Sequence, residues 1–247
     1  MRGIILAAGR GSRLKNITDD KPKCLVQLAG QPLLNWQLKA MRSAGIERIM
    51  VVRGYKGHMV TGDFETCDNH NWDSSNMVAS LMCAEKWLRE GPCLVSYADI
   101  VYSSGAVKKL ASSPAELAML YDEDWYELWS KRFEDPLSDA ESFLLDEKGF
   151  IEDIGRKDVT LSEIQGQYMG LLKFTPESFD WIKSVINGDI SLLAKLDMTS
   201  LLQGLIKKGF NIKAVPWKSP WCEIDSADDL AVAERLVASG ELNYKHE

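Results

Sequence analysis

The chain begins with an apolar run that leads directly into a glycine-rich turn, MRGIILAAGRGSRLK. Residues 3–7 are apolar at every position, which predicts a strand buried on both sides. Apolar runs and amphipathic stretches then alternate for most of the chain. This alternation is typical of helices packed on both faces of a largely parallel sheet, and it indicates an α/β fold.

The same pattern predicts further elements. A helix over 32–45 begins at Pro32, places Leu33, Trp36, Ala40 and Met41 on one face, and ends at a glycine. One amphipathic helix is expected over 76–91 and a closing helix over 225–240, with acidic residues in its first turn. Strands are expected over 48–52, 93–99, 167–174 and 211–217.

Length and composition predict one folded unit. A chain of 247 residues with 45% hydrophobic content can bury one substantial core. We expect a single domain over 1–247, built as a Rossmann-like three-layer αβα sandwich with a mostly parallel mixed central sheet. The charged, tryptophan-rich stretch at about 121–160 is predicted to be a small insertion over the active site.

The charge balance makes small molecules the expected partners. The formal net charge of −7 would be repelled by nucleic acid and by anionic membranes, so neither is expected to bind. The five cysteines form no C-x-x-C pair, which is typical of reduced thiols in the cytosol. No apolar stretch has the length of a signal-peptide core or a membrane span. We therefore expect a cytoplasmic protein, either a monomer or a homodimer.

The glycine-rich turn, LAAGRGSRL, has the chemistry of a phosphate-binding loop but neither of the two best-known fingerprints. A dinucleotide loop needs a third glycine where this chain has Leu14, and the Walker sequence is absent. Gly9 and Gly11 allow backbone N–H groups to converge on an anion, while Ser12 and Arg13 add side-chain donors. The glycines and the serine are equally compatible with an ordinary turn between a strand and a helix.

Three carboxylates occupy positions suited to a divalent cation. Asp99 ends the apolar run CLVSYAD, so it should project from the carboxyl edge of a strand, where ligands bind in open α/β sheets. Glu223 and Asp225 lie two residues apart in WCEIDS and would share one face of an extended segment. Alternatively, Asp99 is a turn residue and Asp225 caps the helix that follows it.

Two linked motifs, LAAGRGSRL and KPKCLVQLAGQPLL, resemble the signature of the nucleoside-triphosphate transferases that activate sugar phosphates and related small phosphates. The resemblance implies that the loop wraps the triphosphate and that Lys23 and Arg13 are the catalytic cations. It implies Mg²⁺ as the cofactor, with Asp99, Glu223 and Asp225 as ligands. The nucleotide-binding residues it implies are Leu6, Ala7, Ala8, Gly9, Gly11, Ser12, Arg13, Lys23, Gln27 (near the base), Ser80 and Asp99.

Within that superfamily the chain resembles the bacterial phosphocholine and phosphonate cytidylyltransferases, through its compact length, the segment SSNMVASL and the stretch YDEDWYELWSKRFEDPLSDAE. Tryptophans bordered by carboxylates can hold a quaternary ammonium or a protonated amine. Packing of these tryptophans onto the sheet is the alternative. Arg132 could instead meet an acceptor phosphonate or carboxylate, and Tyr168 lies in QGQYMGLLKF, which resembles a family segment that lines the acceptor pocket. The acceptor-binding residues expected are Trp125, Trp129, Arg132, Asp139, Glu141, Tyr168 and Trp221.

The function implied is transfer of CMP from CTP to a small phosphate- or phosphonate-bearing acceptor, with release of pyrophosphate. Phosphocholine, phosphoethanolamine, aminoethylphosphonate and a phosphorylated amino acid remain equivalent candidates, and the CDP-activated product would suit the modification of a cell-surface polysaccharide or lipid. One alternative is a sugar-1-phosphate nucleotidylyltransferase. The other is a nucleotide-binding regulatory module without turnover.

Overall fold

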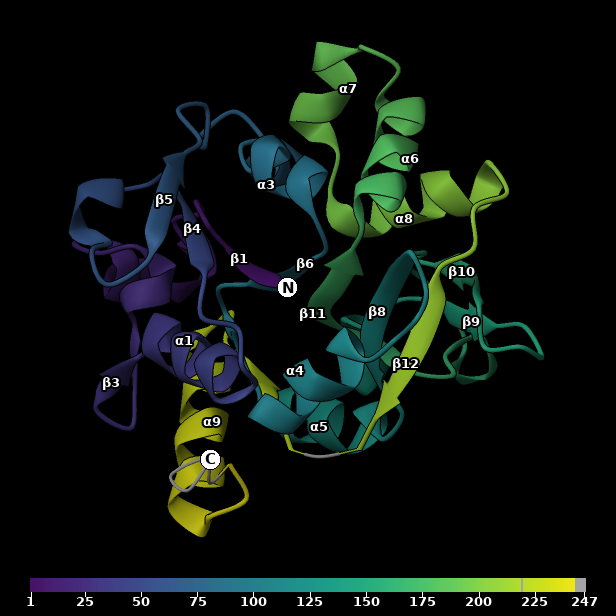
Figure 1. Cartoon of the computed structure of the whole chain (residues 1–247). Helices are drawn as coiled ribbons and strands as arrows, with labels where there is room; N and C mark the ends of the chain where they lie inside the picture. Colours follow the sequence, from purple (N-terminus) through teal and green to yellow (C-terminus); the bar gives the residue numbers. More distant parts are fainter. Residues whose placement is uncertain (219, 243–247) are drawn as a thin grey trace.

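The computed structural model describes residues 1–218 and 220–242, and a seven-stranded sheet lies at its centre (Figure 1). In sheet order the strands are β12 (Lys213–Trp217), β8 (Leu117–Asp122), β11 (Gln167–Phe174), β6 (Cys93–Tyr97), β1 (Arg2–Ala7), β4 (Ile49–Arg53) and β5 (Glu65–Asp68). Strand β11 runs antiparallel to both of its neighbours, whereas the other adjacent pairs are parallel. The predicted mostly parallel mixed sheet is confirmed.

Helices cover both faces of this sheet (Figure 1). One face packs against α1 (Leu33–Ser43), α4 (Ser104–Ala111), α5 (Trp125–Arg132) and α9 (Ala227–Ser239). The other packs against α2 (Met77–Met82), α3 (Glu85–Glu90), α6 (Pro176–Ile186) and α8 (Met198–Lys207), with α7 (Ile190–Lys195) beside them. Each face has its own apolar cluster, so the expected three-layer αβα arrangement is also confirmed.

The single helix predicted over 76–91 is wrong, because the segment forms α2 and α3 with a break at Cys83 and Ala84. The buried apolar positions Val78, Leu81, Ala84 and Leu88 keep helical spacing across the break. At the break the backbone N–H groups of Cys83 and Ala84 donate to the carbonyls of Ser80 and Leu81, three residues back, at 3.2 and 3.0 Å. Bonds of this 3₁₀ type end α2, and α3 begins after Ala84.

Small paired segments lie at the margins of the main sheet. Strand β7 (Ile100–Val101) pairs with β13 (Cys222–Glu223), β9 (Phe143–Leu145) with β10 (Ile151–Ile154), and β2 (Gln27–Leu28) with β3 (Gln31–Pro32). The predicted insertion at about 121–160 begins inside β8, which continues to Asp122. Beyond that strand the insertion comprises α5, a short 3₁₀ turn (Pro136–Ser138) and the β9–β10 hairpin. None of the helices in the described ranges is both long and apolar enough to cross a membrane.

Candidate active site

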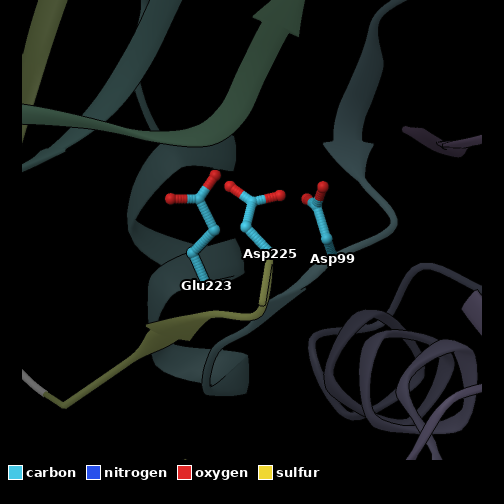
Figure 2. A group of neighbouring side chains, drawn as sticks. All are labelled: Asp99, Glu223 and Asp225. Atoms are coloured by element: carbon cyan, nitrogen blue, oxygen red, sulfur yellow. The ribbon is translucent and has the colours of Figure 1, made fainter. Parts of the chain in front are cut away.

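The pairing of β7 with β13 joins two acidic segments that are far apart in the sequence. Ile100 pairs with Glu223, and the backbone N–H of Ile224 donates to the carbonyl of Asp99 at 2.9 Å. Asp99 follows the end of β6, so this pairing holds Glu223 and Asp225 beside the carboxyl edge of the main sheet. Figure 2 shows the three carboxylates side by side, all projecting to the same side.

Asp225 is not the cap of the helix that follows it. The cap of α9 is Ser226, whose hydroxyl accepts from Asp229 N while the Asp229 carboxylate accepts from Ser226 N, a reciprocal capping box. The Asp225 side chain therefore faces the acidic group, where it contacts Lys23 and lies 2.8 Å from Arg13 Nη2.

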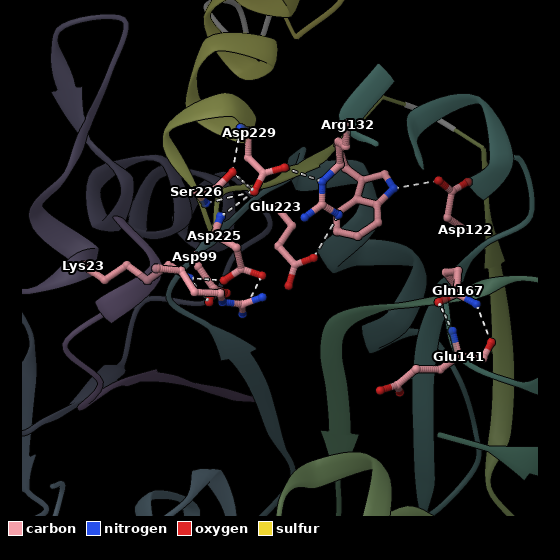
Figure 3. Close-up of polar contacts among 12 residues, drawn as sticks. Lys23, Asp99, Asp122, Arg132, Glu141, Gln167, Glu223, Asp225, Ser226 and Asp229 are labelled. Atoms are coloured by element: carbon pink, nitrogen blue, oxygen red, sulfur yellow. Dashed lines mark hydrogen bonds and ion pairs between the residues drawn. The ribbon is translucent and has the colours of Figure 1, made fainter. Parts of the chain in front are cut away.

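Lys23 is the central cation of this group (Figure 3). Its ammonium donates to Asp99 Oδ2 at 2.7 Å and also to Asp225. Burial opposes the charge on Lys23, but the two carboxylates outweigh that effect and raise its pKa to about 12. Lys23 therefore stays charged across the physiological range and compensates part of the acidic cluster.

The glycine loop is shaped around the Lys23 side chain. Gly11 has φ 75°, a left-handed conformation, and a Cβ built on it would lie 2.8–2.9 Å from the Cβ, Cγ and Cδ atoms of Lys23. Glycine is the residue that satisfies both conditions without strain. The stretch after the loop forms a 3₁₀ turn (Ser12–Thr18) rather than the α-helix of a dinucleotide-binding loop.

The carboxylate group has the donor set of a divalent metal site. One oxygen from each of Asp99, Glu223 and Asp225 lies within 4.8 Å of the others. Asp99 Oδ1 is buried and has no hydrogen-bond partner among the described residues, so it has a lone pair to offer. Burial, together with the charges of Asp225 and Asp99, raises the pKa of Glu223 to about 8. Hard oxygen ligands of this kind suit Mg²⁺.

Two cavities flank the carboxylates. The smaller, of about 140 Å³, is lined by Leu6, Ala7, Ala8, Gly9, Lys23, Cys24, Trp72, Ser75, Asn76, Met77, Ser80, Ala98 and Asp99. The larger, of about 360 Å³, includes Arg13, Glu223 and Asp225 in its lining. Asn76 and Met77 line both cavities, so the two spaces meet beside the acidic cluster.

Most of the residues expected to bind the nucleotide lie on the smaller cavity. Leu6, Ala7, Ala8, Gly9, Lys23, Ser80 and Asp99 line it. Gly11 and Ser12 line neither cavity, although Gly11 covers Lys23. Gln27 is exposed in β2 and also lines neither cavity, so the structure does not bring it to the site.

The acceptor-site residues divide into two groups. Trp129, Asp139, Glu141 and Tyr168 line the larger cavity, whereas Trp125, Arg132 and Trp221 do not. Tyr168 stands where the register of β11 shifts, two residues before Gly170, which has φ 78°. The structure thus brings part of the expected acceptor set to the cavity.

The tryptophans pack with one another instead of forming an open cage. The ring centroids of Trp125 and Trp129 are 6.0 Å apart, and those of Trp129 and Trp221 are 6.1 Å apart. All three are buried, and Trp221 Nε1 donates to Asp122 at 2.8 Å. The guanidinium of Arg132 lies 5.0 Å from the ring centroid of Trp129. The Trp129 ring therefore already has a cation–π partner within the protein.

Arg132 is a structural cation. Its side chain is 1% exposed, its Nη1 donates to Glu223 Oε2 at 3.0 Å, and its Nε donates to Asp229 at 2.8 Å (Figure 3). A direct contact between this guanidinium and an acceptor, as the sequence suggested, would compete with these bonds. Arg132 instead holds Glu223 in position and ties it to the first turn of α9.

Several lining residues were not expected from the sequence. Asp197, Met198 and Thr199 reach the larger cavity from the start of α8, and Trp72 and Ser75 reach the smaller one from the loop before α2. Asp197 is the N-cap of α8, and its carboxylate accepts from Ser200 N at 2.7 Å. The sequence signals a helix start there, but not that this start faces a cavity built from distant parts of the chain.

Comparisons with known proteins find similar sequences. Residues 3–144 match the family described as the MobA-like NTP transferase domain. The CTP:phosphoglutamine cytidylyltransferase of Campylobacter jejuni is 38% identical over 250 residues, covering 94% of this chain and 98% of its own.

Two solved structures share the fold. The inositol-1-phosphate CTP transferase from T. maritima superimposes with a TM-score of 0.75 at 21% identity over 95% of both chains. The CTP:phosphocholine cytidylyltransferase from Streptococcus pneumoniae gives 0.70 at 19% identity, over 96% of this chain and 98% of that one.

Proposed function

Because the chain belongs to the family of MobA-like NTP transferases, we propose that it transfers CMP from CTP to a small phosphate- or phosphonate-bearing acceptor and releases pyrophosphate. The observation that carries the proposal is the meeting of the two cavities at the carboxylates. Asp99 and Lys23 line one cavity, and Glu223 and Asp225 line the other. A transfer reaction needs two substrates whose reacting atoms meet at one charged centre.

The smaller cavity would hold the base of the nucleotide. Its walls are largely apolar, with Ser75 and Ser80 as hydroxyls, and its volume of about 140 Å³ suits a base better than a whole nucleotide. Gly9 lines this cavity, and Gly11, on the same loop, covers Lys23. The triphosphate would lie along that loop, within reach of Arg13, whose guanidinium also lines the larger cavity.

The chemistry would be an in-line displacement at the α-phosphorus of CTP. An oxygen of the acceptor phosphate forms the new bond to phosphorus, and the bond to the β-phosphate oxygen breaks, so pyrophosphate leaves with that electron pair. The acceptor oxygen is already anionic, so no general base is required. Lys23 and Arg13 would offset the charge that develops on the transferred group and on the pyrophosphate.

A divalent cation, which we propose to be Mg²⁺, would be held by Asp99, Glu223 and Asp225. When bound, it would supply further positive charge to the phosphate oxygens. The chain would hold these three carboxylates in position for the cation. Arg132 orients Glu223, and the β7–β13 pairing sets Asp99 against Asp225.

The relative with 38% identity suggests the acceptor class, because its name specifies phosphoglutamine. We therefore place phosphorylated amino acids first among the acceptors. Phosphocholine, phosphoethanolamine and aminoethylphosphonate are the other amine-bearing candidates. A sugar 1-phosphate is the comparison without a cationic group.

A pyrophosphate-release assay tests the proposal. The purified protein with Mg²⁺ is given each of the four nucleoside triphosphates against phosphoglutamine, phosphoserine, phosphoethanolamine, phosphocholine, aminoethylphosphonate and glucose 1-phosphate. Release with CTP and an amine-bearing acceptor, abolished in Asp225→Asn, is the expected result. Release only with glucose 1-phosphate would replace the proposed acceptor. Binding of CTP with no release for any acceptor would favour the regulatory module.

A further inference from the structure

A second charged group lines the larger cavity, apart from the carboxylates assigned to the metal. It consists of Asp139, Glu141 and Lys157. In Figure 3 the Glu141 side chain points to the left, the side on which Glu223 lies. The transfer chemistry proposed above uses none of these three side chains.

The backbone that carries Glu141 is held firmly. The side-chain amide of Gln167 donates from Nε2 to the Glu141 carbonyl at 2.7 Å and accepts from the Glu141 N–H at 3.3 Å (Figure 3). Ser142 then pairs with Arg156, with N–H to carbonyl at 2.9 Å and Arg156 N–H to the Ser142 hydroxyl at 3.0 Å. These bonds place Glu141 and Lys157, the residues next to Ser142 and Arg156, side by side at the cavity wall.

Lys157 is the cation on this wall that a ligand can engage. The neighbouring Arg156 is bound to Asp153 and Glu163, each at 2.9 Å. Lys157 contacts Glu141 at 2.9 Å and keeps 62% of its side chain exposed. A ligand that brings both an ammonium and a carboxylate can replace each half of this pair and leave no charge without a partner.

The overall charge of the cavity favours an ammonium on the ligand. Five carboxylates line it, namely Asp139, Glu141, Asp197, Glu223 and Asp225, against the two cations Arg13 and Lys157. The metal and the phosphates belong with Glu223, Asp225 and Arg13. The remaining carboxylates exceed Lys157 in number, so an ammonium improves the balance.

We propose that this wall recognises a zwitterion, with Asp139 and Glu141 holding the ammonium and Lys157 holding the carboxylate of a phosphorylated α-amino acid. The inference rests on the proposed function and narrows its acceptor. Carboxylates hold the ammonium here because the three tryptophans are buried against one another and Arg132 already lies over the Trp129 ring. An acceptor with an ammonium alone leaves Lys157 competing with it for Glu141.

Acceptor pairs that differ only in the α-carboxylate test the role of Lys157. Phosphoserine and phosphoethanolamine form one pair. Phosphoglutamine and 4-aminobutanamide phosphorylated on the same atom form the other. The expected result is a kcat/KM about two- to fivefold higher for the amino acid in at least one pair, because a partly exposed charge contact discriminates by about that factor. A ratio at or below one in both pairs overturns the proposal.

Variants show which residues produce the preference for the amino acid. In Lys157→Met the ratio should fall toward one, through a higher KM for the amino acid, with the KM for CTP unchanged. Glu141→Gln should raise the KM of both members of a pair. Lys131→Met is the matched control, because Lys131, on α5, is paired with Glu127 and Glu241 and does not line the cavity. An unchanged ratio in Lys157→Met contradicts the assignment.

Failure of the inference and failure of the proposed function give different results. Suppose that phosphocholine or phosphoethanolamine accepts CMP from CTP, but neither phosphoserine nor phosphoglutamine does. The zwitterion assignment is then wrong, while cytidylyl transfer stands. If no acceptor releases pyrophosphate from CTP, both are wrong.

Discussion

The Lys23 ammonium lies 2.7 Å from Asp99 Oδ2 and also binds Asp225, so one cation joins the end of β6 to the acidic segment before α9. Lys23→Met leaves three neighbouring carboxylates without this counter-charge. We expect a loss in kcat/KM of at least about 100-fold, the usual effect of removing one charge-stabilising group.

Lys23→Met should also change the effect of Mg²⁺ on the melting temperature. Mg²⁺ should raise its melting temperature more than it raises that of the wild type, because the metal ion can then replace the missing charge. Thermal melts with and without Mg²⁺ measure this. Equal shifts in the two proteins would mean that Lys23 does not compensate the carboxylates.

Arg132 is predicted to stabilise the fold strongly. Its removal in Arg132→Met leaves the half-buried Glu223 and the buried Asp229 without their cationic partner, at a cost of about 3–5 kcal/mol in the free energy of unfolding. Lys131→Met, one residue earlier and exposed, should change that free energy by less than about 0.5 kcal/mol. Urea unfolding of both variants gives the comparison, and a small effect at Arg132 would contradict its structural role.

Asp122 should make stability depend on pH. Burial raises its pKa above the ordinary value, although hydrogen bonds from Trp221 and from the Asp124 backbone oppose the shift. The folded state then binds the proton more tightly than the unfolded state does. The free energy of unfolding therefore falls as pH rises from the ordinary aspartate pKa, about 4, to the raised value.

Asp122→Asn removes this titration while keeping an acceptor for Trp221. The stability of the variant relative to the wild type should increase as pH rises across that window and level off above it. Urea unfolding at a series of pH values measures the difference. Parallel curves for the two proteins would show that Asp122 does not titrate abnormally.

Gly11→Ala tests the contact between the loop and Lys23. The new Cβ would meet the Lys23 chain at 2.8 Å in a left-handed backbone, so we expect a loss of about 1–3 kcal/mol in stability and weaker CTP binding. Gly9→Ala is the matched comparison for stability, because nothing lies within 4 Å of its built Cβ. Similar losses in the two variants would contradict the packing argument.

The sequence predicted best what depends on neighbouring residues. The strand over 3–7 corresponds to β1, the run CLVSYAD ends at an aspartate beside β7, and the acidic pair of WCEIDS lies at and just beyond β13. Each of these features follows from a local stretch of sequence: an apolar run and the residues that end the run. The break between α2 and α3 was not predicted, because the apolar spacing over 76–91 is compatible with one continuous helix.

Long-range pairings account for most of what the sequence did not predict. Arg132 was expected at the acceptor because its segment is rich in charge, but its partners Glu223 and Asp229 lie more than 90 residues away. Asp197 and Thr199 reach the cavity only because α8 packs beside β10. No local pattern encodes these contacts.

The most direct test of the account follows the oxygen that attacks phosphorus. The protein is incubated with CTP, Mg²⁺ and an amine-bearing acceptor whose phosphate oxygens carry ¹⁸O, and the products are analysed by mass spectrometry. If an acceptor oxygen attacks the α-phosphorus of CTP, the CDP-linked product retains all of the label and the pyrophosphate is unlabelled. Label in the pyrophosphate, or release of pyrophosphate without a CDP-linked product, would contradict it.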